Sequence, residues 1–115
     1  MVRKNSKRII TRAPIRGGNG DIESRRILNT PEELYGKGTI FNHCILQPGQ
    51  SIGDHMHIGN NEIYYVLSGT GDYNDNGTLV KISAGDVTVC NDGESHGAVC
   101  TGTEPLEMIA LILNS

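Results

Sequence analysis

The sequence has no tryptophan, a single phenylalanine and no long hydrophobic run. A membrane-spanning helix needs about 20 consecutive apolar residues, so we predict no membrane partner. The amino-terminal segment is charged but has no apolar stretch of about 7 to 15 residues, which a secretory signal peptide requires. The three cysteines, Cys44, Cys90 and Cys100, cannot all pair with one another and lack the spacing of a zinc ribbon. We therefore expect free thiols in a cytoplasmic protein.

Acidic residues are scarce at the amino terminus, and basic residues are scarce everywhere else. Eight of the ten Lys and Arg residues lie in residues 1–26 with two acidic residues, which leaves +6 there and −9 over the remainder. We predict that residues 1–20 form a basic arm that lies on an acidic barrel, its own or a partner's. A nucleic-acid-binding arm is the less favoured alternative because no aromatic residues alternate with the charges, so we predict no nucleic-acid partner.

Short apolar runs separated by turn residues make up most of the chain, which contains 15 glycines and four prolines. Asn74–Gly77 is the strongest hairpin signal. Thr30–Leu34 predicts one helical turn, with Thr as N-cap and Pro at the first position. Runs this short, spaced by roughly 8–12 residues, are typical of an all-β sandwich or barrel, here one domain over residues 21–115. The expected strands are residues 21–28, 39–46, 63–67, 79–82, 87–90, 97–101 and 106–113.

Four side chains in two segments suggest a metal site. His55 and His57 are two residues apart, and on an extended backbone such residues point to the same side. Glu62 begins the next apolar run. A charged residue in this position is unexpected unless a positive charge lies on the side of the strand to which its carboxylate points. His96 follows a turn at the start of a later strand. The alternative interpretation, that each histidine is an ordinary surface residue, explains none of this spacing.

Imidazole and carboxylate together are typical ligands of a divalent transition metal. Three histidines and one glutamate leave one or two positions of a six-coordinate ion open for a substrate or dioxygen. We therefore predict one divalent ion. Mn, Fe, Zn and Ni all suit three nitrogens and one oxygen, and the residues do not choose among them.

The same residues resemble the two sequence motifs of the cupin family, over residues 49–69 and 85–100. Two positions depart from the family pattern, since Asn91 stands where proline is usual and Cys100 where asparagine is usual. Asn91 is a good turn former, so we expect the turn to persist. Cys100 leaves open which groups hydrogen-bond to the metal ligands. The positions that match are Gly49, His55, His57, Glu62 and Gly69 in the first motif and Gly85, Gly93 and His96 in the second.

The resemblance implies a cupin-type double-stranded β-helix of six to eight strands, jelly-roll-like and often dimeric. It implies that His55, His57, Glu62 and His96 hold the metal at the centre of the barrel. It also implies that the strand face carrying Asn42 and Cys44 points inward. We therefore expect a homodimer that binds a small molecule.

Side-chain alternation gives candidates for a substrate pocket. If Glu62 points inward then so does Tyr64, and if His96 points inward then so does Cys100. Arg25 and Arg26 lie on opposite faces of one predicted strand, so one of them could reach the barrel mouth and hold an anion. Ordinary packing or a solvated charge is the alternative for each. The substrate-binding candidates are Tyr64, Asn42, Arg26 and Cys100.

Three functions fit this pattern. The first is a small metalloenzyme acting on an oxygen-bearing acid or sugar-like substrate, with the metal as Lewis acid or dioxygen activator. Family analogy would make it dioxygenase-like, an isomerase or a decarboxylase, although no separate general base is evident and fold analogy alone does not establish function. The second is a non-catalytic module that binds or senses a small ligand through the metal. The third is a closed structural zinc site.

Overall fold

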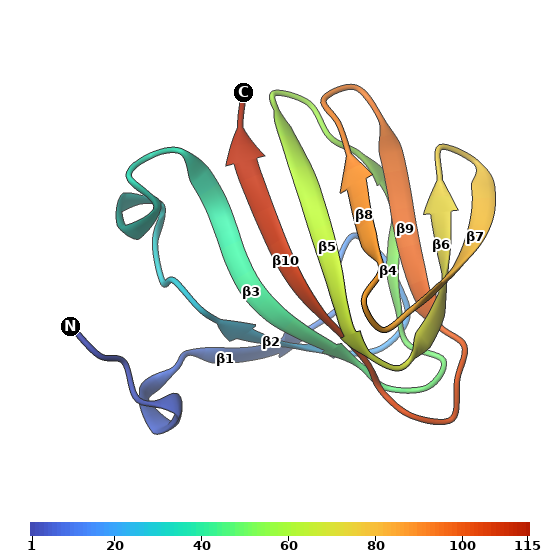
Figure 1. Ribbon diagram of the computed structural model, residues 1–115, viewed down its shortest axis with the longest axis horizontal. Helices are drawn as coiled ribbons and strands as arrows, with labels where there is room; N and C mark the ends of the chain where they lie inside the picture. The colour runs from blue at the N-terminus through green and yellow to red at the C-terminus, as the bar shows by residue number, and fades with distance from the viewer.

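A computed structural model describes all 115 residues, and it consists of β-strands with two short 3₁₀ helices (Figure 1). The all-β prediction is confirmed. Neither helix is long and apolar enough to cross a membrane. In chain order the elements are η1 (Asn5–Lys7), β1 (Ile10–Ala13), β2 (Ile22–Arg26), η2 (Pro31–Leu34), β3 (Gly38–Leu46), β4 (Ser51–Met56), β5 (Asn60–Ser68), β6 (Thr70–Asp75), β7 (Thr78–Ser83), β8 (Val87–Cys90), β9 (Ser95–Cys100) and β10 (Leu106–Asn114).

The strands form two antiparallel sheets. The larger sheet has the order β1-β2-β3-β10-β5-β8, and the smaller has the order β4-β9-β6-β7. Strands that are neighbours in space are often far apart in sequence, as where β10 lies between β3 and β5 (Figure 1). This topology brings β4, β5 and β9, which carry the predicted ligands, to one region between the two sheets.

The inward residues of β3 and β10 divide the interior into a packed end and a hollow end. Leu46 lies opposite Leu106 at the packed end, and neither side chain is exposed. Burying each of these stabilises the fold by roughly 1.5–3 kcal/mol. At the other end of the same strands, Ile40 lies opposite Ile112 and both line a cavity. The packed end therefore supports the sheets while the hollow end remains available to a ligand.

Alternation along β5 follows the predicted pattern. Glu62, Tyr64 and Val66 are buried, whereas Tyr65 and Leu67 are exposed on the outer face. A strand that is buried on one face and partly exposed on the other fixes its register, because a slip of one residue would turn every side chain to the wrong side. The inward direction of Glu62 thus follows from the apolar residues that share its face.

Local turn chemistry confirms two further predictions. Asn76 and Gly77 both have positive φ, 51° and 97°, and form the tight turn between β6 and β7. This is the geometry that Asn-Gly pairs favour in hairpins. At the start of η2, Thr30 caps the helix by accepting a hydrogen bond from the backbone N–H of Glu33.

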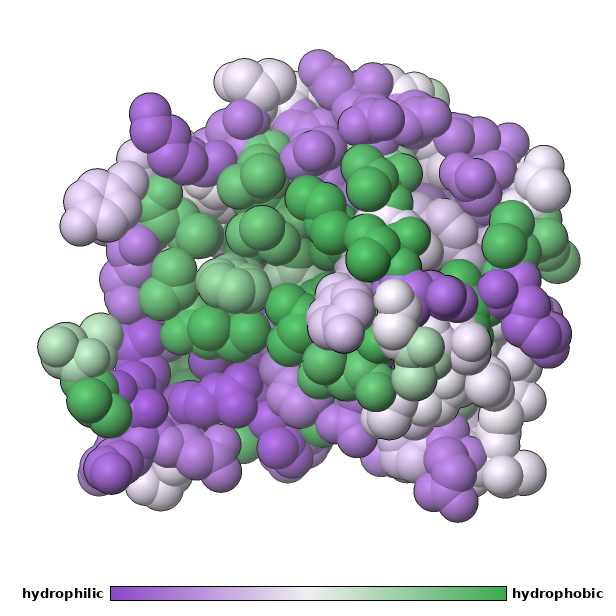
Figure 2. Space-filling model, in the orientation of Figure 1, coloured by the Kyte–Doolittle hydropathy of each residue, from purple (hydrophilic) through white to green (hydrophobic).

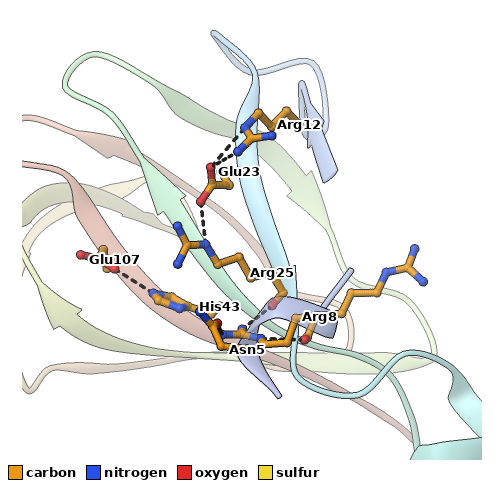
Figure 3. Close-up of polar contacts among 8 residues, drawn as sticks. Asn5, Arg8, Arg12, Glu23, Arg25, His43 and Glu107 are labelled. Atoms are coloured by element: carbon orange, nitrogen blue, oxygen red, sulfur yellow. Dashed lines mark hydrogen bonds and ion pairs between the residues drawn. The ribbon is translucent and has the colours of Figure 1, made fainter. Parts of the chain in front are cut away.

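Part of the predicted arm belongs to the larger sheet, because β1 pairs with β2. Arg12 and Arg25 both pair with Glu23, at 2.8 and 2.7 Å (Figure 3). Arg3 reaches Glu33 at 3.0 Å. The arm therefore lies on acidic groups of its own chain. The sequence did not predict β1, because this strand is exposed throughout and carries no buried apolar face.

Candidate metal centre

Three strands from both sheets supply the four predicted ligands. His55 on β4 lies directly opposite His96 on β9, so the two imidazoles share one face of the smaller sheet. His57 follows β4 immediately, and its backbone N–H donates to the carbonyl of Glu94. Glu62 comes from β5 in the facing sheet. The residues thus meet between the two layers rather than on a single surface.

The four side chains converge on one point. One ligand atom from each lies within 4.8 Å of all the others. The Nε2 atom of His57 is 3.1 Å from that of His55 and 3.1 Å from that of His96. The Oε1 atom of Glu62 is 3.2 Å from Nε2 of His57, 3.0 Å from that of His96 and 3.8 Å from that of His55. This cluster could hold one metal ion.

The hydrogen bonds of the Nδ1 atoms show why a cation fits here. Nδ1 of His55 donates to the carbonyl oxygen of Gly53 at 2.7 Å, and Nδ1 of His57 lies 2.7 Å from Oδ1 of Asn60. Because both partners accept, each Nδ1 carries the proton and each Nε2 presents a lone pair. Two lone pairs 3.1 Å apart, beside a carboxylate, repel unless a positive charge lies among them. Metal-binding histidines usually have their second nitrogen held in this way.

The charges in the cluster shift its pKa values. Burial alone would raise the pKa of Glu62, but hydrogen bonding and attraction to the surrounding imidazoles outweigh it and lower that pKa to about 2. Hydrogen bonding of the protonated imidazole to the Glu62 carboxylate raises the pKa of His55, against the opposing effect of burial. The site therefore favours a fixed negative charge and bound positive charge.

A cavity of about 110 Å³ opens beside the cluster, with mainly apolar walls. Two substrate-pocket candidates from the sequence, Asn42 and Tyr64, lie in its wall. The ring of Tyr64 stacks on that of His96, with centroids 5.0 Å apart and planes 13° apart. The lining residues are Ile15, Arg16, Ser24, Ile40, Asn42, Cys44, Ile52, His55, His57, Glu62, Tyr64, Ala110 and Ile112.

The other two pocket candidates lie elsewhere. Arg26 is near the end of β2, and its guanidinium donates to the carbonyl of Asn29 at 3.0 Å rather than entering the cavity. Cys100 does point inward, as its parity predicts, but it packs in the hydrophobic core and its thiol donates to the carbonyl of Glu104. Side-chain alternation correctly gives the face of a strand on which a residue lies. It does not show whether that residue lies at the cavity or in the packed core.

The two departures from the cupin pattern leave the centre intact. Asn91 still forms a turn, in which its carbonyl accepts from the N–H of Glu94 at 3.0 Å. His96 is held by Tyr73, whose hydroxyl lies 2.8 Å from Nδ1 of the imidazole. Gly53, Asn60 and Tyr73 therefore orient the ligands, and Cys100 is not needed for this.

Two polar lining residues, Arg16 and Ser24, were missed by the sequence argument. Ser24 lies opposite Cys44 in the register between β2 and β3, which alternation could have revealed. Arg16 sits in the glycine-rich turn before β2, and only the folded contact of that turn with β4 brings it to the cavity.

Comparison with known proteins places the fold in a family. The family model described as Cupin domain matches residues 42–112, which is more than half of the chain and includes all four candidate ligands. This chain is a cupin. The double-stranded β-helix that the sequence motifs implied is thereby confirmed.

Similar proteins from Thermotoga maritima were found both among curated proteins and among solved structures. An oxalate-binding protein is 43% identical over 99 residues, which cover 86% of this chain and 81% of that protein. The crystal structure of a predicted oxalate decarboxylase superposes with a TM-score of 0.94 and 40% identity over the whole of both chains. An uncharacterized Klebsiella pneumoniae protein with a double-stranded β-helix domain is 27% identical, with a TM-score of 0.70 over 87% of this chain and 83% of its own.

Proposed function

We propose that this cupin holds one divalent metal ion through His55, His57, Glu62 and His96 and binds a small carboxylate such as oxalate beside it. The observation that carries the proposal is the convergence of unprotonated imidazole nitrogens and a carboxylate at the wall of an open cavity. When bound, the ion supplies a Lewis-acidic charge with open coordination positions. Mn, Fe, Zn and Ni suit this ligand set equally.

The size of the cavity favours a small ligand. Its volume is about 110 Å³, several times the minimum of about 10–15 Å³ that one water molecule needs. A two-carbon dicarboxylate fits such a space, whereas a sugar derivative would have to extend into solvent. The similarity to an oxalate-binding protein supports the same choice.

Binding is favoured over catalysis by the side chains in the cavity wall. Burial raises the pKa of Cys44 to about 12 and raises that of Tyr64 well above its ordinary value. Both groups therefore stay protonated at neutral pH, and neither is poised near that pH as a general base. The remaining polar side chains of the wall, apart from the metal ligands, are those of Arg16, Ser24 and Asn42.

A metalloenzyme is the second candidate, supported by the similarity to a predicted oxalate decarboxylase. An open cavity beside the metal ligands also favours either function over a closed structural zinc site. The two candidates differ in whether oxalate is consumed.

The test is calorimetric titration of the Mn²⁺-loaded protein with oxalate. We expect one oxalate per chain, with binding abolished by metal removal and by His55→Ala. The matched control is His43→Ala, because His43 lies on the outer face and pairs with Glu107 at 2.8 Å. Oxalate binding that survives metal removal would contradict the proposal, and release of carbon dioxide over hours would favour the enzyme.

We also propose a homodimer in which the outer face of the larger sheet packs against a second copy. Figure 2 shows hydrophobic side chains gathered over this face, within a hydrophilic rim. The register aligns the patch in two rows across four strands, so it is continuous. An apolar face of this kind marks an interaction site more often than free surface. Its members are Phe41, Ile63, Tyr65, Val87, Val89, Ile109 and Leu111.

The cytoplasm remains the proposed location. Its support is that Cys44, Cys90 and Cys100 are all buried free thiols, which a reducing compartment preserves.

A further inference from the structure

Arg16 differs from every other arginine of the chain. Five of the six arginines donate to a carboxylate or carbonyl of the protein: Arg3, Arg8, Arg12, Arg25 and Arg26. The guanidinium of Arg16 has no such partner, and Arg16 is an exposed residue in the wall of the cavity beside the metal ligands. A cation without a protein partner at the wall of a ligand cavity is available to an anion from outside.

The backbone around Arg16 is built to hold it there. Arg16 and Gly17 both have positive φ, 53° and 73°, and the N–H of Gly18 donates to the carbonyl of Ile15 at 3.0 Å. Together these define a tight turn of the type that favours Gly or Asn at both central positions. Arginine at the first of them is strained, and such strain persists where surrounding contacts fix it.

Those contacts come from β4, the strand that carries His55. The N–H of Gly53 donates to the carbonyl of Ile15 at 3.1 Å, and the N–H of Ser51 donates to the carbonyl of Asn19 at 3.0 Å. The approach is so close that a Cβ on Gly18 would collide with the carbonyl of Ser51, and one on Gly53 with that of Arg16. Gly53 also accepts the hydrogen bond that orients His55. One stretch of β4 therefore positions both a metal ligand and Arg16.

The charges indicate what kind of anion would fit. Glu62 offsets one of the two charges of a divalent ion, and Arg16 adds one positive charge beside it. The ion and Arg16, an exposed residue of the wall, then place a net charge of +2 at a cavity with mainly apolar walls. A small dianion balances this charge, whereas a monoanion or a neutral ligand does not.

Resting on the proposed function, we propose that Arg16 is the specificity-determining residue of the site, pairing with carboxylate oxygens of a small dicarboxylate. Glycolate differs from oxalate in having a hydroxyl in place of the second carboxylate, so it serves as the comparison ligand. Arg16 then favours oxalate over glycolate.

The experiment measures Mn²⁺ content and the affinities for oxalate and glycolate in the Mn²⁺-loaded protein and its variants. We expect Arg16→Gln to keep one Mn²⁺ per chain and to bind oxalate about 10- to 100-fold more weakly. Glycolate affinity should change less than about threefold, so the preference for oxalate shrinks by about tenfold. Arg16→Lys should retain part of the preference, and Gly18→Ala should weaken it by displacing the turn.

Arg12→Gln is the matched control, because it removes one positive charge from the same segment but lies outside the cavity wall. It should leave both affinities unchanged. If the wild type binds oxalate and Arg16→Gln keeps its preference, or if Arg16→Gln loses the metal, this inference is overturned while the proposed function stands. If the Mn²⁺-loaded wild type binds neither acid, the proposed function fails and the role of Arg16 fails with it.

Discussion

In each histidine of the candidate metal centre, a polar group of the protein holds Nδ1, the nitrogen that does not face the proposed metal. Tyr73 holds His96 through its hydroxyl, 2.8 Å from Nδ1. We expect Tyr73→Phe to weaken metal binding by about 10- to 100-fold, the usual effect of removing such a partner. The phenyl ring keeps the volume, so the fold should persist. The measurement is metal affinity by competition with a chromophoric chelator.

Tyr64→Phe is the control for this change. Tyr64 stacks on the same imidazole but donates no hydrogen bond to it. If Tyr64→Phe weakened metal binding as much as Tyr73→Phe does, the loss would not be specific to the hydrogen bond between Tyr73 and His96.

Protonation of the same residues sets the pH dependence of metal binding. Hydrogen bonding to Glu62 raises the pKa of His55, so in the metal-free protein its proton competes with the metal at a higher pH than for a free imidazole. Metal affinity should therefore fall as pH decreases, starting above about pH 6.5. Glu62, with a pKa of about 2, stays ionised and adds no slope in this range. Affinity that stays constant between pH 8 and pH 5 would contradict three histidine ligands.

The ligand set was predictable because it depends on local spacing. His55 and His57 lie two residues apart on an extended backbone, and Glu62 breaks an apolar run, so both signals lie within one short segment. His96 was a candidate because it follows a turn at the start of a later strand, and the resemblance to a second motif supported it. Arg16 was not predictable, because its position depends on a strained turn and on hydrogen bonds to β4, which lies far along the chain.

At the scale of elements, the motif glycines serve the connections between strands. Gly69, between β5 and β6, has a φ of 84°, and a Cβ there would collide with the carbonyl of Pro105. Gly69→Ala should lower the free energy of unfolding by about 3 kcal/mol or more, because the positive φ and the collision both oppose it. Urea denaturation measures this change.

Gly85→Ala is the matched comparison, since Gly85 has a φ of 91° but a Cβ there would contact nothing within 4 Å. It should cost only the backbone strain, about 1–2 kcal/mol. Equal losses for the two variants would mean that the contact with Pro105 is unimportant.

Strands with a buried apolar face were the ones that the sequence identified. β8 and β10 were predicted almost to the residue, because Val87–Cys90 and Leu106–Asn114 are apolar and bounded by turns. β1, β4 and β6 were not, because β1 is exposed and β4 and β6 consist mostly of polar residues and glycine. The order of strands in each sheet was not predicted, because no local pattern specifies which distant strands pair.

At the scale of the whole molecule, the apolar outer face predicts the state of assembly. Tyr65 is 46% exposed at the centre of the patch, so Tyr65→Asp should leave the folded chain stable but place a charge in the dimer interface. By analytical ultracentrifugation we expect the wild type to sediment with twice the chain mass of 12.4 kDa. The variant should sediment as a monomer of 12.4 kDa. Dimerisation of the variant would bury an unpaired carboxylate in the interface, and the free-energy cost of doing so opposes assembly.

Leu79→Asp is the control for this prediction. Leu79 is 70% exposed on β7, in the other sheet, and should not affect assembly. A monomeric wild type, or a dimer that survives Tyr65→Asp, would contradict an interface at this face.

The central claim is that one cation lies among His55, His57, Glu62 and His96. The most direct measurement combines elemental mass spectrometry of protein prepared without a polyhistidine tag with anomalous X-ray diffraction from its crystals. We expect about one divalent transition metal ion per chain and a single anomalous peak among the three Nε2 atoms and the Glu62 carboxylate. Protein that binds no such ion when it is supplied, or a peak at any other place in the molecule, would contradict this claim.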